Sequence, residues 1–88
     1  MTVTTMKQKT ETPPNYLDIV KVFGDLDLQN TLFCYGDTIY NPGGKTIPPD
    51  LEIHEQTHSV QQGHALDLWW EKHLTDPQFR LSQEIEAY

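Results

Sequence analysis

The sequence predicts a small α+β domain in which a short antiparallel β element is followed by helices. Two runs rich in β-branched and aromatic residues, 31–35 and 38–40, are separated by Gly36-Asp37, a two-residue hairpin signal. Helix start and stop signals follow in the second half of the chain. With 88 residues the chain can hold one domain, which buries only roughly 60 to 65% of its unfolded surface.

Outside the hairpin, the first half of the chain contains an N-terminal polar segment, one apolar segment and one turn signal. Residues 1–14 are polar and Thr-rich, and we expect them to be a flexible N-terminal segment ahead of a domain over residues 15–88. The apolar residues within 15–23 fit a short helix about as well as a strand. After the hairpin, Asn-Pro-Gly-Gly at residues 41–44 predicts a turn.

Three helices are predicted in the second half. Pro48-Pro49-Asp50 is a start signal for a helix over residues 50–62, and Gly63 is its expected stop because glycine favours the left-handed backbone at a helix end. Asp76-Pro77 predicts a capped third helix that continues to the end of the chain. Between them, a second helix over 65–74 is indicated by apolar residues at helical spacing, which we expect to pack in the core: Leu66, Trp69, Trp70 and Leu74.

The composition excludes several classes of partner. The net charge is −7 and no basic cluster occurs, so nucleic acids and anionic membranes are poor partners. No stretch has the apolar length of a secretory signal or of a membrane span. The single cysteine, Cys34, excludes an internal disulfide and fits a reducing compartment. We therefore expect a soluble, cytoplasmic monomer.

A metal-binding pattern lies within the predicted helix over 50–62. It reads His54-Glu55-Gln56-Thr57-His58, and the composition gives a chance expectation of roughly 0.012 matches. Residues four apart lie one helical turn from each other, so both imidazoles can bind one ion. Glu55 lies about 100° around the helix from His54, where it can reach a water on the metal without binding the metal itself. The alternative is that both are ordinary surface histidines on a helix whose buried side is Ile53, Thr57 and Val60.

A hydrolytic zinc site usually has three protein ligands and one water, so a third donor is required. The downstream donors are His64, Asp67, Glu71, His73, Asp76, Glu84 and Glu86. In the last predicted helix, Leu81, Glu84, Ile85 and Tyr88 form one stripe, which predicts that Glu84 faces inward. A buried carboxylate is costly without a cation, so Glu84 is the expected third ligand. Glu86 falls on another face, where a solvated charge is expected.

These residues resemble a known family. The HExxH pattern at 54–58, followed by Glu84-Ile85-Glu86-Ala87, is similar to the gluzincin group of metallopeptidases, in which a later glutamate lies in an ExxA-like helix. The resemblance covers residues 50–88 and implies a zincin-like fold, with zinc held by His54, His58 and Glu84 and with Glu55 as the catalytic residue. It also implies a β-strand that aligns an extended substrate, for which residues 38–40 are the candidate. Many members carry an acidic residue just after the ExxA element, and Tyr88 lies near the corresponding place.

The function expected from these observations is hydrolysis of peptide bonds in a peptide or protein substrate. Metal-activated water would attack the carbonyl carbon, with Glu55 as general base and then as general acid. The donor to the oxyanion stays open among His64, His73, Arg80 and Tyr40. Two alternatives are a non-catalytic or regulatory peptide-binding protein and a repressor-cleaving metallopeptidase of a mobile element. A nucleophilic role for Cys34 is not expected, since no partner histidine is near it in the sequence.

Overall fold

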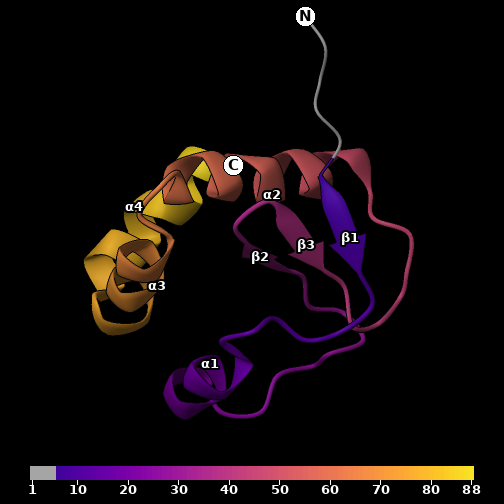
Figure 1. Cartoon of the computed structure of the whole chain (residues 1–88), viewed down its shortest axis with the longest axis horizontal. Coiled ribbons are helices and arrows are strands. Elements are labelled where there is room, and N and C mark those ends of the chain that lie inside the picture. Colours follow the sequence, from indigo (N-terminus) through magenta and orange to yellow (C-terminus); the bar gives the residue numbers. More distant parts are fainter. Residues whose placement is uncertain (1–5) are drawn as a thin grey trace, which may run out of the picture.

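The computed structural model describes residues 6–88, which form a three-stranded sheet and four helices (Figure 1). The small α+β architecture predicted from the sequence is therefore present. In chain order the elements are β1 (Lys7–Lys9), α1 (Tyr16–Phe23), β2 (Phe33–Tyr35), β3 (Thr38–Tyr40), α2 (Pro49–Gln62), α3 (Leu66–Thr75) and α4 (Pro77–Ala87).

The predicted hairpin is formed by β2 and β3. These strands are antiparallel, with Cys34 opposite Ile39, and Gly36 in the turn has a φ of 64°, in the left-handed region that glycine adopts without a steric penalty. The strand order is β1-β3-β2, because β1 pairs in parallel with the other edge of β3. Strand β3 is therefore the central strand, and β2 is an edge strand.

Strand β1 lies in a segment that was expected to be flexible. Its three residues are all exposed, so the strand has no apolar alternation that a sequence pattern could reveal. It is held by backbone pairing with β3, extended by bonds from Lys7 N to Asp37 O and from Asn41 N to Lys9 O. The prediction of a flexible start is thus wrong for Lys7–Lys9, and residues 1–5 lie outside the described part of the chain.

The helix signals in the sequence correspond to real boundaries. Helix α2 ends at Gly63, which has a φ of 49° and donates its N–H to the carbonyl of Ser59. Helix α4 begins after Asp76, whose carboxylate accepts hydrogen bonds from the backbone N–H groups of Gln78 and Phe79. The segment that fitted helix or strand equally well is helix α1.

The hydrophobic core joins the sheet to α1 and α3. As predicted, Trp69 and Trp70 are buried; they pack with Ile19, Phe33 and Tyr40. Helix α2 runs along one side of the strands and α1 lies on the other, while α3 and α4 lie together at one end (Figure 1). Helix α4 packs against both α2 and α3, which brings the end of the chain to the predicted metal-binding helix. Within residues 6–88, no helix is long and apolar enough to cross a membrane.

Candidate metal centre

The buried face of α2 is polar. His54, Glu55, His58 and Gln62 are all buried, whereas Ile53 and Val60 are 61% and 80% exposed. The alternative that made Ile53, Thr57 and Val60 the buried side of the helix is therefore wrong. Burial of a row of polar groups is costly unless they are paired or bind an ion. The partners of each buried side chain therefore show whether this face of α2 binds the rest of the protein or could bind an ion.

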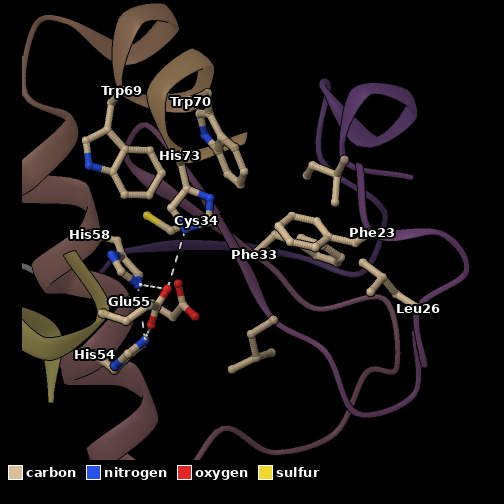
Figure 2. A pocket seen from close by; sticks show the side chains of 13 residues that line it. Phe23, Leu26, Phe33, Cys34, His54, Glu55, His58, Trp69, Trp70 and His73 are labelled. Carbon is tan, nitrogen blue, oxygen red and sulfur yellow. Dashed lines mark hydrogen bonds and ion pairs between the residues drawn. The ribbon is translucent and has the colours of Figure 1, made fainter. Parts of the chain in front are cut away.

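The side chains of His54, His58 and Glu84 converge at the contact between α2 and α4. Nε2 of His54 lies 3.0 Å from Oε2 of Glu84, and Nε2 of His58 lies 3.2 Å from Oε1 of the same carboxylate. The two Nε2 atoms are 3.1 Å apart. One ligand atom from each residue lies within 4.8 Å of the other two, so this group could bind a metal ion. Figure 2 shows His54 and His58 pointing to the same place.

Glu84 occupies this place for a different reason than the sequence pattern suggested. The stripe that was expected to pack inward is largely exposed, with Leu81 at 61% and Ile85 at 65%, and Tyr88 is exposed as well. Helix α4 instead turns Glu84 and the buried Ala87 toward its neighbours. The prediction for Glu84 is compatible with the geometry, but the apolar stripe from which it was argued does not form a packed face. Glu86 is exposed, as expected for a solvated charge.

Of the other donors considered, His73 alone reaches the site. Its side chain is 12% exposed, stacks on the Trp69 ring with centroids 4.7 Å apart, and places Nε2 at 3.6 Å from Oε1 of Glu84. It is not part of the group whose ligand atoms lie within 4.8 Å of one another. The remaining donors considered for a metal are all exposed: His64, Asp67, Glu71, Asp76 and Glu86.

Glu55 lines the same cavity as the three converging side chains. Burial raises its pKa to about 7; the charge on His58 works against the rise and the charge on Glu84 adds to it. A carboxyl group with such a pKa can both take and return a proton near neutral pH. Cys34 lines the cavity too, but burial, together with the charges of Glu55 and Asp37, raises the pKa of its thiol far above the ordinary value. Cys34 is therefore a poor nucleophile, in line with the prediction.

The carboxylate of Glu84 and the imidazole of His58 stabilise each other's charge. Pairing with His58 first, and then with the nearby His73, holds the pKa of Glu84 well below its usual range. Burial works to lower the pKa of His58, but its hydrogen bonds to Glu84 and Gln61 outweigh this effect and raise it. The pair thus favours an ionised Glu84, the form that binds a metal, together with a protonated His58, which has to lose a proton before it can bind one.

Gln61 supports the site in a way that the sequence analysis missed. Its Oε1 accepts a hydrogen bond from Nδ1 of His58 at 2.8 Å, and its Nε2 donates to the backbone carbonyl of Gln83 at 3.0 Å. A proton on Nδ1 leaves Nε2 of His58 free for a metal. Gln61 therefore orients one histidine and also ties α2 to the residue before Glu84. Its position three residues after His58, one turn along the helix, is the only signal that the sequence offers.

Gln62 fixes α2 to the sheet. This fully buried side chain accepts from the N–H of Gly36 at 2.6 Å and donates to the carbonyl of Cys34 at 2.8 Å. The bonds occupy backbone groups of the hairpin where it faces α2. The prediction that residues 38–40 align a substrate is wrong, because β3 is paired on both edges, with β1 and with β2.

Two imidazoles and one carboxylate are a donor set that matches the His2Glu type of catalytic zinc site. The convergence of His54, His58 and Glu84 is compatible with a metal site, and the three donors come from two helices that pack together. Comparisons with protein-family models, curated proteins and solved structures find no match. The assignment of chemistry therefore depends on the geometry of the site itself.

Proposed function

We propose that the chain is a zinc-dependent metallopeptidase that hydrolyses peptide bonds, with zinc held by His54, His58 and Glu84. The observation that carries the proposal is the buried Glu55 in the cavity that these three residues line. A structural zinc site needs no base beside the ion, and such sites are commonly closed by four ligands. The presence of Glu55 beside three converging donors supports a catalytic site over a structural one.

In this proposal the chain's own residues handle protons and position the substrate. Zinc held by His54, His58 and Glu84 would supply Lewis-acid chemistry, which lowers the pKa of a coordinated water from about 15.7 toward 7 and polarises a substrate carbonyl. Glu55 takes a proton from the attacking water, and it then delivers that proton to the departing amine. Water oxygen bonds to the carbonyl carbon, the C–N bond breaks, and the products are an acid and an amine.

His73 is the best placed of the four candidates for the oxyanion donor. It lines the cavity, its Nδ1 is buried without a hydrogen-bond partner within residues 6–88, and its Nε2 lies 3.6 Å from Glu84, beyond ordinary hydrogen-bond length. Arg80 is engaged elsewhere, since its guanidinium donates to the carbonyls of His73 and Leu74. Tyr40 does not line the cavity, and His64 is exposed beyond the end of α2. We therefore assign the stabilisation of the oxyanion to His73.

The proposal is tested by Glu55→Gln, with zinc content and cleavage of a peptide library measured on the same preparations. The amide keeps the shape of the side chain but cannot act as a base, so zinc should stay bound while turnover falls by at least about 10²-fold to 10⁴-fold. Glu52→Gln, on the same helix and outside the cavity lining, is the matched control and should retain full turnover. Undiminished turnover in Glu55→Gln would end the proposal. Zinc-loaded wild type that cleaves no library peptide would favour a binding or regulatory role.

A further inference from the structure

A second cavity lies between α1 and α3, and it shares only Trp70 with the cavity of the metal centre. Its volume is about 590 Å³, within the range of roughly 300–1,000 Å³ that is usual for pockets of small organic ligands. The lining comes from these two helices, from the residues before α1 and from the end of β2. None of its other lining residues takes part in the peptidase chemistry proposed above.

Asn15 lines this cavity with a buried amide that has no partner. The residue stands directly before α1, where an asparagine side chain commonly caps the helix, but its side chain forms no cap bond. Both Oδ1 and Nδ2 are buried and lack a hydrogen-bond partner within residues 6–88. A buried amide that is left unpaired is destabilising, so this one indicates a ligand that offers both a donor and an acceptor.

Trp70 is an independent indication of a ligand in the same cavity. The residue is only 8% exposed, and its Nε1 is buried without a hydrogen-bond partner in the described part of the chain. Tyr35 lines the cavity as well, so two aromatic rings border it. Aromatic faces favour a cation, and the planar guanidinium group stacks on them best.

The charges around the cavity also favour a cation. Three carboxylates line it, those of Asp18, Asp67 and Glu71. Lys21 is the cation of the lining, and its Nζ lies 3.9 Å from Oδ1 of Asp18, so these two charges offset each other. Asp67 and Glu71 lie one turn apart on α3, are exposed, and form no salt bridge within residues 6–88. They are therefore free to pair with a positively charged ligand.

We propose that this cavity binds an arginine residue of a peptide or protein partner. A guanidinium carries several N–H donors in one plane, which suit the carboxylates of Asp67 and Glu71 and the Oδ1 of Asn15, and its face suits the aromatic rings. The backbone carbonyl of the same arginine supplies an acceptor for the buried Nδ2. A lysine ammonium lacks the planar face, and a neutral residue would leave both carboxylates unpaired. The site lies outside the metal centre, so the inference does not depend on the proposed function.

The first experiment titrates the full chain calorimetrically with N-acetyl-argininamide and with N-acetyl-citrullinamide, which has nearly the same shape but no charge. The arginine amide should bind at least about 10-fold more tightly, because only its donors are charged. It should also bind more tightly than N-acetyl-lysinamide and than free arginine. Equal affinity for the arginine and citrulline amides would overturn the inference. Equal affinity for the lysine amide would overturn the choice of a guanidinium, and tighter binding of free arginine would overturn a peptide as its carrier.

Carboxylate variants test whether the binding depends on this cavity. Glu71→Gln removes one exposed charge from the lining and should weaken binding of the arginine amide by about 2-fold to 5-fold, as for other exposed ion pairs. Glu86→Gln makes the same change of net charge on α4, outside the lining, and should bind the amide like wild type. An equal loss in both variants would show that only net charge matters and would overturn the inference.

Asn15→Leu tests the buried amide. The variant should bind the arginine amide about 10-fold more weakly, while its Tm should not fall below that of wild type, because the lost amide has no partner in the free protein. A lower Tm would show that the amide is already paired and would remove this argument for a ligand. NMR of the wild type locates the ligand: the side-chain amide signals of Asn15, which lines this cavity and not that of the metal centre, should shift on titration. Shifts confined to His54 and His58 would overturn the inference.

Discussion

The two histidines of the candidate metal centre differ in how their rings are held. His58 donates from Nδ1 to Gln61, which is itself bonded to the backbone of α4. Nδ1 of His54 is buried and has no hydrogen-bond partner within residues 6–88, and its ring instead lies 4.3 Å from that of Tyr88. One ligand is oriented by hydrogen bonds and the other mainly by packing.

This difference shows where the site is preorganised. A hydrogen bond to the second ring nitrogen selects the tautomer and the angle of a histidine, whereas an aromatic contact restricts the ring without selecting a tautomer. Since Gln61 also bonds to α4, the orientation of His58 and the position of Glu84 depend on a common side chain. We therefore expect the His58 side of the site to respond more strongly to changes around it than the His54 side.

The largest effect is expected for Glu84, because it faces both histidines. Glu84→Ala removes one of three donors, so zinc affinity should fall by more than the roughly 10-fold to 100-fold typical for loss of an outer-shell partner. Glu86→Ala is the matched control on the same helix, and it should keep its zinc. For both variants, zinc content is measured after dialysis, and zinc affinity is measured by competition with a chromogenic chelator. Equal zinc content in the two variants and wild type would remove Glu84 from the site.

A smaller loss of zinc affinity is expected when the hydrogen bonds that orient His58 are removed. Gln61→Ala removes the acceptor for Nδ1 and the bond to α4, and it should weaken zinc binding by about 10-fold to 100-fold. Gln61→Glu keeps the acceptor and loses the donor, so it should recover most of the affinity if orientation of His58 is what matters. Zinc affinity is measured by chelator competition, and ¹⁵N NMR of the imidazoles reports the tautomer of His58.

The control for this prediction is Gln56→Ala. Gln56 lies on the same helix between the two histidines, and its side chain makes no hydrogen bond with residues 6–88. Its zinc affinity and NMR spectrum should match those of wild type. If Gln61→Ala binds zinc like Gln56→Ala while the tautomer of His58 is unchanged, hydrogen bonding does not orient this ligand.

The helices and the hairpin could be predicted because their signals are local. A glycine after the last helical turn, an Asp-Pro pair and a two-residue turn act within a few residues, and the structure confirms Gly63, Asp76 and the hairpin at Gly36. The spacing of His54 and His58 is local in the same way. Their convergence therefore follows from helix formation alone.

The packing of α2 against α4 could not be predicted from the sequence, because the apolar residues of these two helices do not mark the faces that are buried. Ile53 and Val60 on α2, like Leu81 and Ile85 on α4, are exposed, and the two helices meet through polar side chains instead. Hydrophobic patterning assumes that a helix buries its apolar face. That assumption fails where a row of histidines and glutamates is buried. Strand β1 was missed for a related reason, since it is held by backbone bonds and buries no side chain.

The smallest effect is expected on the His54 side, from Tyr88→Ala. The contact of the Tyr88 ring with His54 is aromatic packing, which contributes roughly 0.5–1.5 kcal/mol and corresponds to about a 2-fold to 10-fold change in zinc affinity. Ile85→Ala, one turn earlier on α4 and largely exposed, controls for the loss of apolar surface. The same chelator competition that is applied to Gln61→Ala measures both variants. A loss from Tyr88→Ala as large as that from Gln61→Ala would show that packing orients His54 as firmly as the hydrogen bond orients His58, and the proposed asymmetry between the two ligands would be wrong.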